Sequence, residues 1–84
     1  MHLLSKEVDI RATVEVNTND RPRQLHIEIT ATTIRLSHKW NQTEISVKEA
    51  KAYPQRIVTG VFACVPEVYV YESEAVVKFI MGNI

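Results

Sequence analysis

One polar face of the chain carries residue types that bind metal ions or transfer protons. His26 and Glu28 lie two residues apart in an alternating segment, so they share one face of a predicted strand. Thr13 and Glu15 are their expected neighbours on the preceding strand. An imidazole beside carboxylates can hold a metal or pass a proton. No third ligand is evident in the sequence, so we interpret this face as solvated surface and expect neither metal nor cofactor.

The other candidate catalytic groups stand where nothing activates them. Cys64 lies in the apolar run 61–65, which raises a thiol pKa rather than lowering it, so we expect a small buried side chain. Glu67, Glu72 and Glu74 bracket a predicted strand and a helix cap, and the helix dipole accounts for Glu72 and Glu74 near the start of that helix. With only two glycines, the chain has no glycine-rich phosphate loop. We assign no catalytic residue, and the pattern favours a protein that is not an enzyme.

Aromatic residues provide two candidate binding sites. Tyr69 and Tyr71 alternate with valines, and tyrosine is enriched at interfaces because its ring buries area while its hydroxyl keeps a hydrogen bond. We therefore take Tyr69, Tyr71 and Trp40 as a candidate protein interface. His38 precedes Trp40 on an apolar row with Leu36, which predicts a core position. As an alternative, His38, Trp40 and Tyr69 are candidates for a ligand pocket between sheet and helix.

Basic residues give a further alternative, a nucleic-acid surface. Arg21, Arg23, Arg35 and Lys39 could contact phosphates, with Trp40 and the tyrosines as stacking platforms. Lysine plus arginine and aspartate plus glutamate balance at ten each, however, which argues against a protein that lives by neutralising phosphates.

Length and composition indicate one domain over residues 1–84. Hydrophobic residues make up 45% and charged residues 24%, which is ordinary globular composition. No apolar run reaches the length of a membrane span, and the single cysteine excludes an internal disulfide. We expect a cytoplasmic protein that does not associate with membranes.

The first half of the chain predicts a hairpin. Apolar residues alternate with polar ones from Val8 to Val16 and again from Leu25 to Ile29, with a polar loop between them. Tight closure of the loop pairs Val16 with Arg23, Val14 with Leu25, Ala12 with Ile27, Arg11 with Glu28 and Ile10 with Ile29.

Beyond Ile29 the apolar phase shifts, and the order of elements is less determined. We interpret residues 24–40 as one long strand with a bulge near Ala31, the alternative being a threonine-rich turn between two strands. Asn41-Gln42 is the expected hairpin loop, which pairs Lys39 with Glu44, His38 with Ile45 and Leu36 with Val47. The strand after this loop runs to about Ile45.

Helical and strand signals compete in the second half. Ser46 and Glu49 have capping-box spacing, which predicts a helix over about 47–53 that stops at Pro54. The apolar run 57–65 favours a strand buried on both faces, and 68–71 another strand. Ser73 is the expected cap of a C-terminal helix over about 74–81 with Gly82 as its C′ residue, although the valines also allow a last strand.

These elements predict an α+β domain with an antiparallel sheet of about four to six strands, one short middle helix and a C-terminal helix. The most favoured function is a small non-enzymatic interaction or regulatory module that acts through protein–protein contacts, as a homodimer or with another protein. The alternatives are a small-ligand-binding or enzymatic domain and a nucleic-acid binder.

Overall fold

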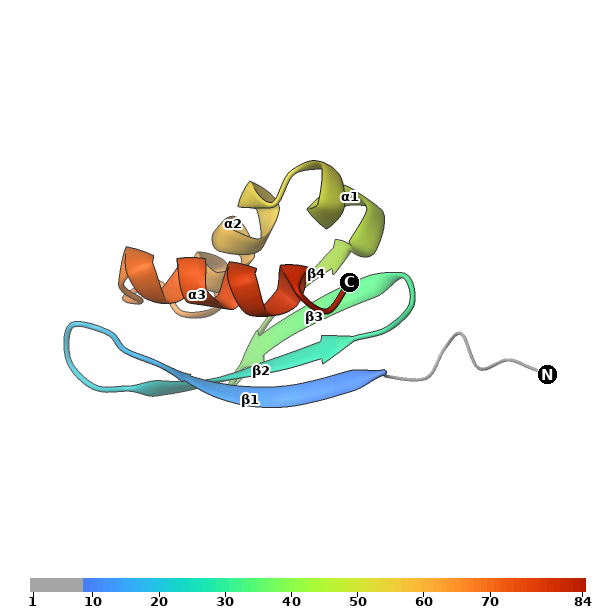
Figure 1. Ribbon diagram of the computed structural model, residues 1–84. Helices are drawn as coiled ribbons and strands as arrows, with labels where there is room; N and C mark the ends of the chain where they lie inside the picture. Colours follow the sequence, from blue (N-terminus) through green and yellow to red (C-terminus); the bar gives the residue numbers. More distant parts are fainter. Residues whose placement is uncertain (1–8) are drawn as a thin grey trace.

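The computed structural model describes residues 9–84 as an antiparallel sheet with helices packed on one face (Figure 1). The strands lie side by side in sequence order. This confirms the predicted α+β class, with a strand count at the lower end of the expected range. Val8, where the first strand was expected to begin, lies outside the described residues. The elements are β1 (Ile10–Val16), β2 (Arg23–Ile29), β3 (Thr33–His38), β4 (Asn41–Ser46), α1 (Val47–Ala52), α2 (Gln55–Cys64) and α3 (Val70–Met81).

The β1–β2 hairpin has the predicted register throughout. Val16 pairs with Arg23, Ala12 with Ile27 and Ile10 with Ile29. The loop is closed by Thr18, whose buried hydroxyl oxygen accepts from the Arg21 amide at 3.1 Å. The clean alternation fixes this register because a shift of one residue would put apolar side chains in water.

Residues 24–40 form two strands, so the preferred single bulged strand was wrong and the threonine-rich turn was right. The Thr30 amide donates to the Thr33 carbonyl oxygen at 2.8 Å, which closes the turn. The Thr30 hydroxyl also accepts from the amides of Thr32 and Thr33 at 3.3 and 3.0 Å. A threonine side chain can thus hold a turn that contains no glycine, proline or asparagine.

The β3–β4 hairpin turns at Lys39-Trp40 rather than at Asn41-Gln42. His38 pairs with Asn41, which shifts every pair of the predicted register. The predicted Leu36–Val47 pair is replaced by Leu36–Thr43, and Lys39 adopts φ 55° in the left-handed region. The observed register sets Ile34 against Ile45 and Arg35 against Glu44. Favourable pairs on both faces offset the strain at Lys39.

Helix α1 confirms the predicted middle helix to within one residue. The Ser46 hydroxyl accepts from the Glu49 amide at 2.9 Å, as a capping serine does. The helix ends at Ala52, ahead of Tyr53 and Pro54. A proline cannot continue a helix from the preceding residue without a clash, which explains the stop.

Helix α2 occupies the run where a doubly buried strand was predicted, so that prediction was wrong. Its buried residues Ile57, Gly60, Val61 and Cys64 recur at helical spacing and form one stripe. Thr59 and Ala63 on the other side of the helix are exposed. The run resembles a doubly buried strand because Val58, Phe62 and Ala63, which are half-buried or exposed, are also apolar.

Helix α3 confirms the C-terminal helix but begins earlier than predicted, at Val70, so the predicted strand over 68–71 was wrong. Val68 forms only an isolated bridge with Thr18. Ser73 is not the cap: it is fully buried within the first turn, and its hydroxyl donates to the Val70 carbonyl oxygen at 2.6 Å. Gly82 ends the helix at φ −75°, a conformation that other residues also adopt.

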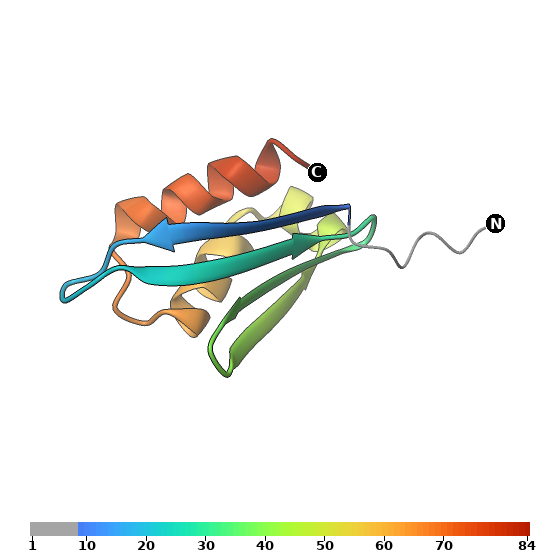
Figure 2. The same cartoon turned by 90° about the horizontal axis from the view of Figure 1, so that it is seen from below.

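The core lies between the sheet and the helices. One sheet face contributes the fully buried Leu25, Ile27, Ile34 and Leu36. In the described part of the chain, residues 9–84, no helix covers the opposite face (Figure 2), and its side chains are polar along all four strands. No helix within residues 9–84 is long and apolar enough to cross a membrane.

Candidate functional site

The outer edge of β1 is the first candidate site. Since β1 is the first strand in the sheet order, it pairs with β2 alone among the strands of residues 9–84, and half of its backbone hydrogen-bonding groups point away from these strands. Its core-side residues Ile10, Ala12 and Val14 are only half-buried, whereas Leu25 and Ile27 on β2 are fully buried. The core is therefore incompletely covered along this edge.

Natural sheets protect such edges with proline, lysine, bulges or charges that point inward. In β1 the residues from Ile10 to Val16 include no proline or lysine, and both charged side chains, Arg11 and Glu15, lie on the polar face. The strand pairs with β2 without a break in register. The edge is thus long, regular and able to accept another strand.

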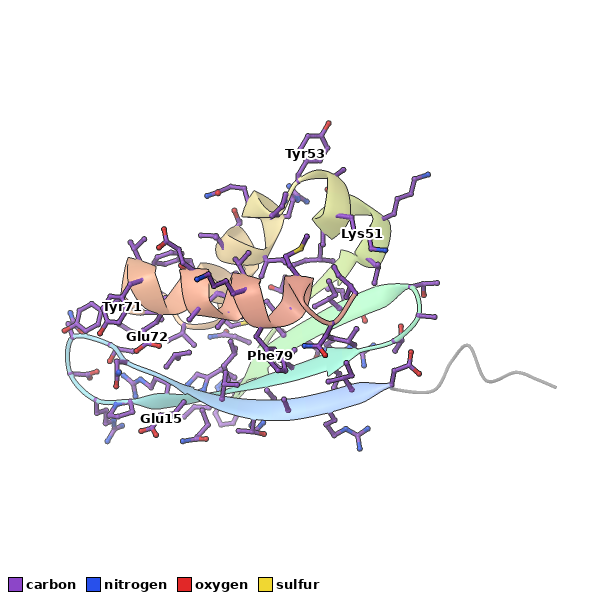
Figure 3. All side chains as sticks on the ribbon, in the orientation of Figure 1. Glu15, Lys51, Tyr53, Tyr71, Glu72 and Phe79 are labelled. Carbon is purple, nitrogen blue, oxygen red and sulfur yellow. The ribbon has the colours of Figure 1, made fainter. Side chains whose placement is uncertain are left out.

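A shallow apolar groove adjoins this edge. Helix α3 runs alongside β1 (Figure 2), and the two elements enclose a hollow of about 120 Å³. Figure 3 shows Phe79 on the side of α3 that faces the sheet, while Glu15 projects from the far side of β1. Glu72 is held by the Asn17 amide at 2.6 Å. The apolar lining consists of Val14, Val16, Ile27, Ala75, Val76 and Phe79.

The polar face of the sheet carries a ladder of alternating charges that crosses all four strands. The Arg11 Nε donates to Glu28 at 3.2 Å, and Arg35 contacts Glu28 at 3.1 Å and Glu44 at 3.0 Å. The hydrogen bond to Glu44 and its negative charge raise the pKa of Arg35. The charges of this ladder are therefore neutralised by one another.

The predicted pair of His26 and Glu28 does not form a joint site. His26 Nδ1 lies 2.9 Å from the hydroxyl of Thr13, which was predicted as its cross-strand neighbour. Glu28 instead accepts hydrogen bonds from two arginines. Across residues 9–84, no three histidine, cysteine, aspartate or glutamate side chains are placed to hold a metal ion.

Cys64 is the small buried side chain that its apolar surroundings predicted. It is fully buried in α2, and its thiol donates to the Leu36 carbonyl oxygen at 3.4 Å. Burial raises the pKa of the Cys64 thiol, which keeps it protonated and unreactive.

A second candidate site lies where the β1–β2 loop meets the β3–β4 turn. Arg21, Arg23, His38 and Lys39 line a hollow of about 520 Å³ there. Arg23 is bound to Asp20 at 3.2 Å and lies 3.9 Å from Glu67. Hydrogen bonds from the Thr18 hydroxyl and the Arg21 amide lower the pKa of Asp20. Three of the four basic residues predicted to bind nucleic acid therefore gather here, whereas Arg35 is held in the ladder.

Trp40 is 94% exposed at the tip of the β3–β4 turn, so its predicted place on an apolar face with Leu36 was wrong. His38 sits at the end of β3 with Nδ1 3.0 Å from the Gln24 carbonyl oxygen, and it is half-buried rather than in the core. His38 and Trp40 both line an adjoining hollow of about 220 Å³, but Tyr69 does not. The predicted ligand pocket is therefore brought together in part.

The tyrosines of the predicted interface lie at the start of α3. The rings of Tyr69 and Tyr71 stack with centroids 5.6 Å apart, and their exposed fractions are 41% and 60%. They are separate from the residues that line the hollow beside Trp40. The β1–α3 groove was not predicted, although the alternation of β1 already contained its apolar row.

Comparison with known proteins adds no relative: no protein-family model, curated protein or solved structure matches this chain.

Proposed function

We propose that this chain is a non-enzymatic protein-interaction module that associates as a homodimer through the β1 edge and the groove beside α3. The observation that carries the proposal is the half-buried row of Ile10, Ala12 and Val14 on an unprotected edge strand. A strand added there supplies partners for the outward backbone groups, and its side chains cover the groove. Two-fold dimers are the commonest homo-oligomers, and pairing two such edges covers both of them.

The polar groups support a binding role over catalysis. Four charged side chains of the open sheet face neutralise one another in the ladder, and the thiol of Cys64 is buried. Because one cysteine cannot form an internal disulfide, we also propose a cytoplasmic location, where thiols stay reduced.

The first prediction concerns Ala75, an exposed groove residue of α3. The wild-type chain should elute as a dimer at tens of micromolar in size-exclusion chromatography with light scattering. Ala75→Glu should shift it to monomer, because a charged side chain in the groove must be desolvated when the partner strand covers it. Glutamate is a good helix former, so the fold itself should be unaffected.

Ala63→Glu is the matched control, since Ala63 is an exposed alanine of helix α2 outside the groove. It should leave the mass unchanged. A wild-type chain that stays monomeric at tens of micromolar would contradict self-association.

One observation favours a second candidate function, the binding of single-stranded nucleic acid. The sole tryptophan, Trp40, is exposed beside Arg23 and Lys39, and exposed aromatics next to cations stack with bases.

If this function is correct, a thymidine oligonucleotide should quench the fluorescence of Trp40 to saturation at low salt. Added salt should reverse the quenching, because binding releases the counterions of the phosphates and salt opposes that release. Because the chain has one tryptophan, the signal reports on this site directly. The variant Arg21→Gln/Lys39→Gln should weaken the quenching. Emission that stays constant throughout the titration rules the function out.

A further inference from the structure

We infer that the partner at the β1 edge is a second copy of β1, paired antiparallel about a two-fold axis that passes through Thr13. This inference rests on the proposed function, because it specifies the partner and the register at the same edge. Thr13 is the middle residue of β1, which spans Ile10–Val16. An axis at this residue is therefore the one that pairs the whole strand with its copy.

The register must first match the two faces of the sheet. Residues directly opposite each other in an antiparallel pair point to the same face. A two-fold axis at Thr13 sets Ala12 opposite the partner's Val14, and Ile10 opposite the partner's Val16. The apolar rows of the two copies then form one continuous surface on the side of the helices, where the core is incompletely covered. An axis midway between two residues would set apolar side chains opposite polar ones.

Among two-fold axes at residues 11–15, only the axis at Thr13 makes the charges on the polar face complementary. Arg11 and Glu15 lie two residues on either side of Thr13, so each Arg11 faces the partner's Glu15. Symmetry repeats the pair, which gives two attractive contacts per dimer. The two-fold rotation brings a negative charge of the second strand opposite each positive charge of the first, and the reverse. An isologous interface requires this kind of self-complementarity.

Neighbouring registers that match the faces lose this complementarity. An axis at Ala12 places Asp9 opposite the partner's Glu15, which creates two repulsive contacts. An axis at Val14 places Arg11 opposite the partner's Asn17 and leaves Glu15 opposite a threonine. Axes at Arg11 or Glu15 set like charges directly against each other, which destabilises a sheet.

Both charged side chains are available for these contacts. Arg11 is 70% exposed at its side chain and binds Glu28 through Nε alone, which leaves its two terminal amino groups for another carboxylate. Among residues 9–84, Glu15 forms neither an ion pair nor a side-chain hydrogen bond, and it is exposed. Of the residues that the structure describes, none gives Glu15 a charged partner within one copy, whereas the proposed dimer provides Arg11 of the second copy.

Charge reversal tests the register. Arg11→Glu places a second carboxylate opposite the partner's Glu15 at both contacts, and Glu15→Arg creates the opposite repulsion. Each single variant should raise the dimer dissociation constant roughly tenfold or more, since two attractive pairs become repulsive. Sedimentation velocity over a concentration series measures the constant. Glu44→Arg is the matched control, because it also breaks an ion pair of the polar face, but on the opposite edge strand β4. It should leave the dimer dissociation constant unchanged.

Recovery of the dimer separates the interface from effects on folding. The double variant Arg11→Glu/Glu15→Arg still lacks the Arg11–Glu28 contact but restores both contacts between the copies. It should dimerise within about threefold of wild type, which is a fraction of a kcal/mol. A mixture of the two single variants should form a heterodimer, because each variant supplies the charge that the other lacks.

The outcomes distinguish this inference from the proposed function. If the wild-type dimer is disrupted by Ala75→Glu but not by either charge reversal, the edge is used in another register and the inference fails alone. If the double variant stays as weak as the single variants, the inference is likewise overturned. If the wild type is monomeric, the proposed function fails as well.

Discussion

Replacing Leu36 with alanine should lower the free energy of unfolding by about 3 kcal/mol. Leu36 is fully buried at the centre of the sheet, on β3 under helix α2. Its Cδ1 lies 3.1 Å from where a Cβ on Gly60 would be. The close approach of helix and sheet leaves the surrounding backbone little freedom to collapse into the vacated volume, so a cavity remains.

The expected loss is large for a chain of this length. Domains of about 84 residues are stable by roughly 4–13 kcal/mol. Urea denaturation followed by circular dichroism measures the change, with an unchanged m-value as the sign that the unfolded surface is the same. Leu36→Met keeps the volume and should cost less than about 1.5 kcal/mol.

Trp40→Ala is the informative comparison, because the register predicted from sequence places Trp40 on the same apolar row as Leu36. In the structure Trp40 is 94% exposed, so its removal should change stability by less than about 0.5 kcal/mol. Equal losses for the two substitutions would contradict the turn at Lys39-Trp40.

The β1–β2 hairpin could be predicted in full because its signals are local and agree with one another. Strict alternation fixes which side chains face the core, and the polar loop fixes which residues can pair. The cap of α1 was predictable for a similar reason: Ser46 and Glu49 interact within one turn of helix.

Predictions failed where two local patterns fitted the same residues. In α2, Val58, Phe62 and Ala63 interrupt the polar side of the helix, which made the run resemble a doubly buried strand. The stripe of Ile57, Val61 and Cys64 was already present at helical spacing. The apolar run 57–65 is also longer than the roughly four to eight residues of a usual buried strand, which favours a helix.

The candidate sites were the least predictable part, because they depend on long-range arrangement. No residue near Ile10 in the sequence indicates that β1 is an edge strand of the sheet, or that helix α3 lies beside it. The position of the β3–β4 turn determines the environment of Trp40. The turn lies two residues earlier than predicted, so Trp40 is exposed to solvent rather than part of the core. Once strand order is known, the charge pattern of β1 can be interpreted from sequence alone.

Replacing Gly60 with valine should lower the free energy of unfolding by about 3 kcal/mol, an effect as large as that of Leu36→Ala. Gly60 is a buried residue of α2 that faces β3 and β4. An added Cβ would meet the side chains of Ile45 and Leu36 at 3.1 Å and that of Thr43 at 3.3 Å. Those contacts are too tight for the further methyl groups of valine, so the helix must move away from the sheet.

Gly60→Ala separates the two opposing effects at this site. Alanine is a better helix residue than glycine by about 1 kcal/mol, and this gain offsets the cost of shifting the two flexible side-chain ends. We therefore expect a net change within about 1 kcal/mol. Ala63→Val, on the exposed side of the same helix, is the control for the lower helix propensity of valine and should cost about 0.5 kcal/mol.

Combining Gly60→Val with Leu36→Ala gives the most direct test of how closely the helix and the sheet are packed. The first substitution adds methyl groups at the point where the second removes them, because the atoms concerned are 3.1 Å apart. The double variant should therefore be more stable than the sum of the single losses by about 1–3 kcal/mol. Additive losses would mean that the two residues do not contact each other, and would place α2 elsewhere on the sheet. Helix α2 packs over β3 and β4, whereas Ile10, Ala12 and Val14 at the opposite edge of the sheet are only half-buried, and this incomplete cover is the basis of the proposed dimer.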